Sequence, residues 1–407
     1  MNKWSINSVD VASAFLQGNE IKRDVFLKPP KEICPKDHVW KLKRCIYGLN
    51  DAPREWYNKV VEEFIKSGAV KSVLDTAMFM WYNKDDELVG HLVTHVDDFI
   101  YVGDTQWNKN VMDKIKDKFN ISSEFEGSFK YIGLNVVQSN EMISIDQMHY
   151  IENINEIDLG RERKKLIRDI LTPEERSKLK SLSGKMLWVT SQTRPDIAFA
   201  TCMMCNAGPE ATVNDILEAN KAVRKMKNSN DVKINYRKLG NMKDVKLIVY
   251  ADASHANLND GSSQGAFIVF LQGNGKVSPL LWQSKKLKRI TKSPLASETL
   301  AFGEGADAGI LMSNVIQEVC RLKNKPEVIC YTDGKSLKTH LGTSNTVEDM
   351  SLRTNMARLR QMIEMKEICA EWVPGKNQLA DCLTKKTASS DHLLGVLATG
   401  ILKNDGH

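Results

Sequence analysis

The sequence predicts a multidomain fold with an antiparallel α+β part, a helical part and a final α/β part. At 407 residues the chain is long enough for two or three domains, each with its own core. Short runs rich in β-branched and aromatic residues alternate with stretches of helical periodicity in the first and last parts. Residues 227–243 are rich in Asn, Lys and Gly, which is typical of a linker at a domain boundary.

The composition excludes several classes of protein. Hydrophobic residues make up 42% and charged residues 27%, as in soluble globular chains. No apolar run reaches the roughly 18 residues that span a bilayer, and the N-terminus lacks the apolar core of a secretory signal. We therefore expect an intracellular protein that is not secreted and has no membrane partner. The net charge of +6 permits a polyanionic partner without requiring one.

The eight cysteines are too sparse for a disulfide scaffold and suit a reducing compartment. Cys202 and Cys205 form a lone CxxC inside an apolar stretch, and no second pair at metal-binding spacing follows them. We expect these two side chains to be buried thiols.

The first thirty residues predict a strand, a short helix and a second strand. Asp10 stands where an apolar strand gives way to the small residues that end at Gly18. The short run 25–27 is closed by two prolines, which end a strand. A single Asp at a strand end is usually a cap. A functional role for Asp10 is supported only if a second acidic site lies nearby.

Residues 39–66 predict a half-exposed strand and a helix entered through Pro53, with Asn50 or Asp51 as its cap. Cations and aromatic rings interleave along this stretch. They are Lys41, Lys43, Arg44 and Arg54, with Trp40, Tyr47, Trp56 and Tyr57. Nucleic-acid grooves use this combination, but an amphipathic surface whose lysine stems cover apolar atoms fits equally well.

Residues 92–103 predict two strands joined by an acidic turn at Asp97 and Asp98. Two carboxylates at a hairpin tip repel each other unless a cation lies between them, and a divalent metal ion is the obvious candidate. A solvated Asp-Asp turn between two strands is the alternative.

Residues 151–226 predict mostly helix. The charged segment 151–180 favours a solvated helix face over a contact with a template. Thr172 to Glu175 is typical of a capping box that begins a helix, which runs to the break at Arg194 and Pro195. A second helix is expected at 209–226.

The last part of the chain predicts three strands, a helix, a strand, a helix, a strand and a final helix. The strands are expected at 245–251, 265–271, 277–282, 327–332 and 368–373, and the helices at 293–322, 353–366 and from 381. Four acidic residues stand at or near element ends: Asp252, Glu298, Asp333 and Asp381. Distant carboxylates can meet at such ends without placing their charge inside an apolar core.

Five blocks, in order along the first half of the chain, resemble those of copia-type retrotransposon reverse transcriptases. They are Asp10 to Gly18, Tyr47 to Tyr57, His95 to Asp98, Phe129 to Leu134 (similar to a primer grip) and Gln192 to Ala198 (similar to a Thr-Arg-Pro-Asp connection signature). One block would be a weak signal, but five in order are specific.

The resemblance implies a reverse-transcriptase palm in which Asp10 and Asp97 bind two Mg²⁺ or Mn²⁺ ions and Asp98 supports them. Such ions, about 3.5–4 Å apart, activate the primer 3′-hydroxyl and stabilise the leaving pyrophosphate. Expected partners are an RNA template, a DNA primer and other Pol and Gag products of the element, in a cytoplasmic virus-like particle or the nucleus. The implied nucleic-acid contacts are Tyr47, Gly48, Arg54, His95, Tyr131 and Gly133.

Four later blocks, at 251–254, 296–299, 331–334 and 379–385, resemble copia-type ribonuclease H, whose element order is the one predicted above. The resemblance implies a five-stranded ribonuclease H-like fold that hydrolyses the RNA of RNA–DNA hybrids with two Mg²⁺ or Mn²⁺ ions. The metal ligands carried over are Asp252, Glu298, Asp333 and Asp381. Lys285, Lys286, Lys288 and Arg289 are well placed to hold the phosphates of the hybrid.

The chain departs from the family in three places. His95 stands where the family usually has Tyr, and the segment 351–360 lacks the His found in many members. The chain begins nine residues before Asp10, so the fingers segment that grips the incoming triphosphate has no counterpart. We therefore expect poor polymerisation or none.

These observations predict four regions. Residues 1–150 form a palm and thumb without fingers, 151–240 a helical connection with a linker, 241–387 a ribonuclease H-like domain and 388–407 a C-terminal tail. The leading hypothesis is an enzyme that has ribonuclease H activity and little or no polymerase activity. The alternative is a catalytically inactive, decayed retroelement product that only binds nucleic acid.

Overall fold

The computed structural model describes residues 4–30, 32–33, 38–258, 260–343, 347 and 349–402. The chain divides into two compact units, which are described here separately. The N-terminal unit contains the residues up to Tyr131 and the segment Glu318–Arg321, and the C-terminal unit contains Ile132–Gln317 and the residues from Leu322 on. Both mix helices with sheets, as the sequence predicts. In the described part of the chain no helix is long and apolar enough to cross a membrane.

The N-terminal unit is built on a six-stranded antiparallel sheet with the strand order β4-β5-β6-β7-β1-β8. Its strands are β1 (Ile6–Val11), β4 (Val70–Lys71), β5 (Met78–Tyr82), β6 (Leu88–His95), β7 (Asp98–Gly103) and β8 (Ile121–Glu126). Outside this sheet lie β2 (Phe26–Leu27), β3 (Trp40–Lys41) and β9 (Ser128–Tyr131). The predicted strand, acidic turn and strand at 92–103 are therefore β6, the turn and β7.

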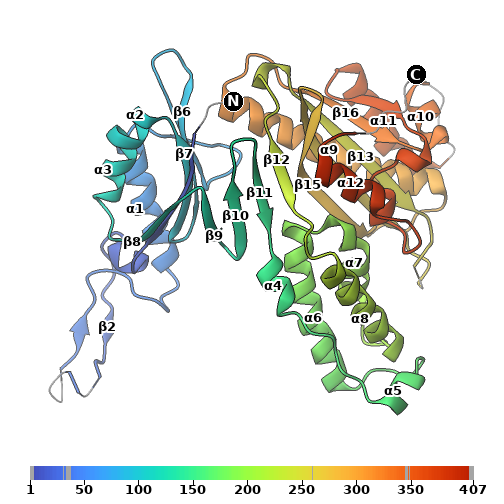
Figure 1. The fold of residues 1–407 in the computed structure, drawn as a ribbon, viewed down its shortest axis with the longest axis horizontal. Helices are drawn as coiled ribbons and strands as arrows, with labels where there is room; N and C mark the ends of the chain where they lie inside the picture. The colour runs from blue at the N-terminus through green and yellow to red at the C-terminus, as the bar shows by residue number, and fades with distance from the viewer. Residues whose placement is uncertain are drawn as a thin grey trace. The chain divides into compact units, whose positions relative to one another are not determined.

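Helices cover one face of this sheet (Figure 1), and the hydrophobic core of the unit lies between them and the strands. They are η1 (Ala14–Gln17), α1 (Ala52–Lys66), α2 (Thr105–Trp107), the π-helical turn η2 (Asn108–Met112) and α3 (Asp113–Lys116). Trp56 and Phe64 of α1 pack against Phe99 of β7 in this core. Gly90 permits close packing, because a Cβ atom there would lie 2.1 Å from the Trp107 ring.

The C-terminal unit begins with a small antiparallel sheet and a helical segment. The sheet contains β10 (Leu134–Gln138), β11 (Met142–Asp146) and β12 (Ile234–Arg237). The helices are α4 (Met148–Glu152), α5 (Arg161–Lys165), α6 (Pro173–Gln192), η3 (Pro195–Ile197), α7 (Ala198–Asn206) and α8 (Val213–Asn228). The capping box predicted at Thr172 and Glu175 is confirmed.

A five-stranded mixed sheet forms the rest of this unit, in the order β15-β14-β13-β16-β17. Its strands are β13 (Lys246–Ser254), β14 (Gln264–Gly273), β15 (Lys276–Lys286), β16 (Glu327–Thr332) and β17 (Cys369–Trp372). The first three pair antiparallel, whereas β16 pairs parallel with both β13 and β17. Around it lie η4 (Met242–Asp244), α9 (Pro294–Cys320), α10 (Lys335–Leu341), α11 (Met350–Glu364), η5 (Gly375–Asn377), η6 (Asp381–Leu383) and α12 (Asp391–Thr399).

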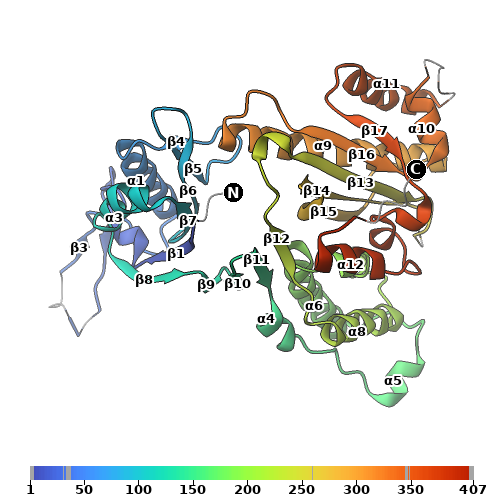
Figure 2. The ribbon, with the colours of Figure 1, turned by 45° about the horizontal axis from the view of Figure 1, so that its top comes forward.

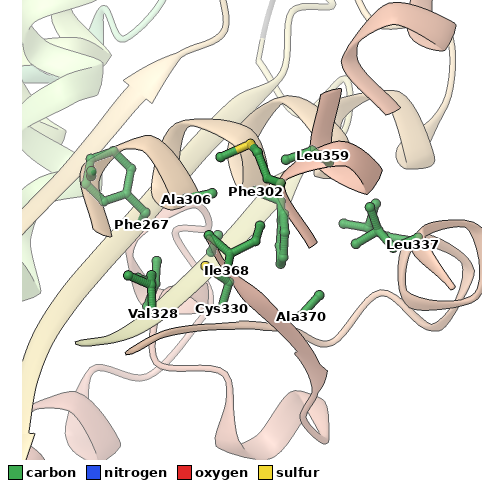
Figure 3. Packing of buried hydrophobic residues seen from close by; sticks show 14 of the residues in the cluster. Phe267, Phe302, Ala306, Val328, Cys330, Leu337, Leu359, Ile368 and Ala370 are labelled. Carbon is green, nitrogen blue, oxygen red and sulfur yellow. The ribbon is translucent and has the colours of Figure 1, made fainter. Parts of the chain in front are cut away.

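Alternate residues of this sheet fill two separate cores. Val249 and Phe267 pack on one face against α9, α10 and α11 (Figure 3), and Figure 2 shows these helices on the side of the sheet opposite α12. Tyr250 and Phe270 fill the other face with residues of α7, β12 and α12. The period of two along each strand therefore buries both faces.

Several predictions differ from the structure. Helix α10 was not predicted, and of the two thiols expected to be buried, Cys202 is partly exposed and Cys205 is exposed. Part of the predicted linker, Ile234–Arg237, forms β12, because Ile234 is buried and the segment pairs with β11. The helix predicted from Asp381 is only the short turn η6. Within the predicted tail 388–407, residues Asp391–Thr399 form α12, because Leu393, Val396 and Leu397 pack into the sheet. Residues 403–407 of that tail lie outside the described residues.

A buried ion pair joins the helices of the C-terminal unit at the predicted connection signature. Arg194 and Asp196 have fully buried side chains, and the guanidinium donates to both carboxylate oxygens at 2.8 Å. Its Nη1 donates to the carbonyl oxygens of Met226 and Ser229 at the end of α8, at 3.0 and 2.9 Å, and its Nη2 also donates to the Ser229 hydroxyl at 2.8 Å. A buried pair of this kind is costly to break from one side.

Replacing Arg194 with methionine is expected to destabilise the C-terminal unit by about 3–5 kcal/mol, because Asp196 stays buried without its partner. Arg224→Met is the matched control, since Arg224 forms an exposed pair with Glu156 on the same helical segment. Loss of that pair is expected to cost about 1 kcal/mol or less. Urea denaturation followed by circular dichroism measures both. Equal losses would contradict the role of the buried pair.

Candidate active sites

Three carboxylates from distant parts of the C-terminal unit meet at one edge of its sheet. Asp252 lies near the end of β13, Asp333 directly follows β16, and Glu298 lies one turn into α9. Because β13 and β16 are parallel neighbours, their carboxyl ends lie at the same edge. One carboxylate oxygen from each of the three residues lies within 4.8 Å of the others. No other set of three potential metal-binding side chains in the described ranges reaches this spacing.

This cluster is electrostatically strained. The Asp252 side chain is only 2% exposed. Burial, opposed by Lys385 and Thr384 but aided by neighbouring carboxylates, raises the pKa of Asp252 to about 6. Burial together with the charges of Asp252 and Asp333 raises the pKa of Glu298 to about 7. Below neutral pH the site therefore holds protons, first on Glu298 and then on Asp252, unless another cation replaces them.

Nearby residues hold the cluster in place. The Thr384 hydroxyl donates to Asp252, and the Thr332 hydroxyl donates to Glu298 at 3.2 Å. Gly334 makes room for Glu298, because a Cβ atom there would lie 2.5 Å from Oε2 of that residue. The sequence patterns did not predict these roles of Thr384, Thr332 and Gly334. Thr384 stands inside the block quoted for Asp381, but its contact with Asp252 bridges 132 residues.

The fourth predicted ligand, Asp381, does not belong to the set of three. Its carboxylate pairs with the ammonium of Lys385, whose Nζ also lies 3.6 Å from Oδ2 of Asp252. Lys385 thus places a positive charge between the two aspartates. The ligand role of Asp381 stays a prediction.

The three clustered residues fit a divalent metal ion. All the oxygens they supply are carboxylate oxygens, the donors that hard cations such as Mg²⁺ prefer. Oδ1 of Asp333 is buried and, among the described residues, has no hydrogen-bond partner. A buried carboxylate oxygen without a partner is costly, and a bound cation would satisfy it.

The predicted palm residues also come together, around the turn between β6 and β7. Asp10 of β1 is the direct cross-strand partner of Asp98 of β7. Burial first, and then the charges of Asp10 and Asp97, raise the pKa of Asp98. Ser122 of β8 donates to Asp10, a contact the sequence did not reveal. The backbone N–H of Val11 donates to the carbonyl oxygen of Asp97 at 2.9 Å.

The predicted nucleic-acid contacts of the N-terminal unit are mostly exposed. Tyr47, Arg54 and His95 are exposed, and Gly48 has a φ angle of 96°, which favours glycine. Tyr131 is partly buried, and burial together with the charge of Asp98 raises its pKa to about 12. Gly133 belongs to the C-terminal unit and also has a positive φ angle, 77°.

The predicted basic residues beside α9 are partly engaged within the chain. Lys285 pairs with Glu304 at 2.6 Å, and Lys286 pairs with Asp260. Arg289 donates to the carbonyl oxygen of Ser351 at 2.6 Å. Lys288 is exposed. Binding of phosphates by these residues stays a prediction.

We expect Mn²⁺ binding at the three-carboxylate cluster to strengthen about tenfold or more between pH 5.5 and pH 8, because the metal must displace protons from Asp252 and Glu298. Calorimetric titration in two buffers of different ionisation enthalpy measures both affinity and proton release. Glu298→Gln removes one of the titrating groups and should flatten the pH dependence. An affinity independent of pH would contradict the expectation that the metal displaces protons from Asp252 and Glu298.

Comparison with known proteins finds similar sequences over most of the chain. Residues 1–167 match the family model described as reverse transcriptase (RNA-dependent DNA polymerase). The Pol polyprotein of transposon RE1 from Arabidopsis thaliana is 26% identical over 94% of this chain. That of transposon TNT 1-94 from Nicotiana tabacum is 24% identical over 93%. The chain spans only 26% and 30% of these two relatives, respectively.

Among solved structures, a complex of LC11 ribonuclease H1 with an RNA/DNA hybrid aligns with 37% of this chain and 99% of its own. The identity is 13% and the TM-score 0.27. A score this low does not establish a shared fold. Residues 1–167 thus resemble reverse transcriptases, and the chain is similar over 94% of its length to Pol polyproteins of transposons.

Proposed function

We propose that the C-terminal unit hydrolyses the RNA strand of RNA–DNA hybrids as a metal-dependent ribonuclease H. The single observation that supports this most is the meeting of Asp252, Glu298 and Asp333 within 4.8 Å at the end of two parallel strands. The strand order, with three antiparallel strands followed by two parallel ones, also agrees with the expected ribonuclease H topology. We assign this activity to residues 241–387.

The residues that would hold two Mg²⁺ or Mn²⁺ ions are Asp252, Glu298 and Asp333, with Asp381 completing the set. When bound, these ions supply an activated water and stabilise the leaving 3′-oxygen. Thr384 holds one oxygen of Asp252 and so fixes the direction in which the other points. Thr332 does the same for Glu298. Lys385 lowers the repulsion between Asp252 and Asp381.

The proposed substrate is recognised by its backbone and shape. A hybrid offers phosphates and 2′-hydroxyl groups, which distinguish its RNA strand without reading the sequence. Lys285 and Lys286 end β15, and exposed Lys288 and Arg289 lie between this strand and α9, the helix that presents Glu298. Their charges support phosphate binding, and this binding should weaken as salt rises.

Asp252→Asn and Glu298→Gln are each expected to reduce hybrid cleavage by about a thousandfold or more, because each removes a charged metal ligand. Cleavage of a labelled RNA strand annealed to DNA measures this in Mg²⁺ and in Mn²⁺. Asp307→Asn is the matched control, since Asp307 lies on the same helix as Glu298 but pairs at the surface with Arg358. Hybrid binding without cleavage by the unaltered protein would instead support the inactive, nucleic-acid-binding alternative.

A second proposed activity is RNA-directed DNA polymerisation at the acidic turn of the N-terminal unit. The direct pairing of Asp10 with Asp98, next to Asp97, supports it, as does the family match. These carboxylates would hold the metal ions that act on a primer terminus and an incoming triphosphate. Partly buried Tyr131 lies near enough to sense the charge of Asp98, which fits a contact with the primer end.

Any primer extension by this chain on a primed RNA template is expected to disappear in Asp97→Asn, because that change removes a ligand charge. Asp117→Asn, an exposed aspartate at the end of α3, should leave extension unchanged. Incorporation of labelled nucleotides into the primer measures both. Extension that survives in Asp97→Asn would remove the acidic turn from the mechanism.

A further inference from the structure

The acidic turn contains a strained residue. Val96 has a φ angle of 58°, in the left-handed region. A β-branched side chain rarely adopts this conformation, and such strain persists only where surrounding contacts enforce it. Val96 directly precedes Asp97, so whatever holds its backbone also sets the direction of the two carboxylates that follow.

One buried side chain contacts this strained peptide directly. The indole N–H of Trp56, on helix α1, donates to the carbonyl oxygen of Val96 at 2.6 Å. On the next residue, the carbonyl oxygen of Asp97 accepts from the backbone N–H of Val11, at 2.9 Å. Two successive carbonyl groups of the turn are therefore fixed, one by a side chain 40 residues away and the other by β1.

The Trp56 ring is itself locked in place. It is 2% exposed and lies parallel to the Phe99 ring, with centroids 6.5 Å apart. Its edge contact with Phe119 has a centroid distance of 5.1 Å. Because packed rings of this size rarely change rotamer, the indole N–H is a rigid donor rather than an adaptable one.

We infer that Trp56 is a positioning residue, whose hydrogen bond to Val96 holds the strained turn so that Asp97 and Asp98 face Asp10. The inference rests on the proposed polymerase function of this turn. Trp56 touches neither substrate nor metal in this scheme. It acts through the backbone of Val96 and gives the carboxylates their direction before any ion binds.

The chain provides a matched control in Trp81. This tryptophan is 3% exposed, belongs to the same core as Trp56, and donates its indole N–H to the hydroxyl of Ser67 at 3.1 Å. Trp81→Phe and Trp56→Phe therefore each remove one buried N–H group and a similar ring area from one core. Only Trp56→Phe removes a contact with the acidic turn.

Two measurements on the full chain test the inference. Hydrogen–deuterium exchange of peptides covering residues 94–99 reports whether the turn is held. Electron paramagnetic resonance reports Mn²⁺ binding, in a chain with Asp252→Asn and Glu298→Gln so that the N-terminal site dominates. Trp56→Phe should speed exchange and weaken Mn²⁺ binding about tenfold each, as expected for loss of one buried hydrogen bond. Trp81→Phe should change neither.

Equal effects of the two substitutions, or none from Trp56→Phe, would overturn the inference in favour of a purely structural tryptophan. Val96→Gly gives a second test, because glycine adopts the positive φ angle without strain. Combined with Trp56→Phe, it should restore slow exchange and Mn²⁺ affinity toward those of the unaltered turn, and no restoration would count against the inference. Absence of Mn²⁺ binding by the unaltered turn would refute the proposed function, while exchange would still decide the role of Trp56.

Discussion

The constraint that shapes both units is the cost of holding several carboxylates together beside an apolar core. At the end of β13 that cost is visible in the raised pKa values of Asp252 and Glu298. The fold meets it with hydroxyl donors from Thr384 and Thr332 and with the ammonium of Lys385. At the turn after β6, the Ser122 hydroxyl donates to Asp10 in the same way, and hydrogen bonds to the carbonyl oxygens of Val96 and Asp97 hold the turn in place. Both arrangements favour a cation.

Much of this framework could be predicted from the sequence because it depends on local patterns. Both faces of β13 and β14 are buried, so these strands stand out in the sequence as nearly continuous apolar runs, and the strands β13 to β15 could be placed within a few residues of their ends. Acidic residues that break an apolar run, such as Asp252 and Asp333, must lie where the strand leaves the core. Parallel pairing then brings them to one edge. The acidic turn followed from the same logic.

The rest depends on contacts that local patterns do not encode. The segment of β12 is short and polar, and only its pairing with β11 and the burial of Ile234 make it a strand. Lys385 was visible beside Asp381, but its approach to Asp252 arises only when η6 packs against the end of β13. Trp56 was expected among the rings that interleave with cations, but it is buried and its N–H partner lies 40 residues away in the sequence. Each of these features depends on tertiary contacts between residues far apart in the sequence.

The buried pair of Arg194 and Asp196 has a consequence for how the five-stranded sheet could be separated from its neighbours. It ties the end of α8 to the start of α7, and Ala198 of α7 belongs to the core beneath the five-stranded sheet. Trp282 of β15 also donates to the carbonyl oxygen of Thr190 on α6 at 2.8 Å. A chain shortened to begin at 241 would therefore expose an apolar sheet face to water. We therefore expect the smallest piece that folds alone to begin before α6 and to contain the helical segment together with the five-stranded sheet.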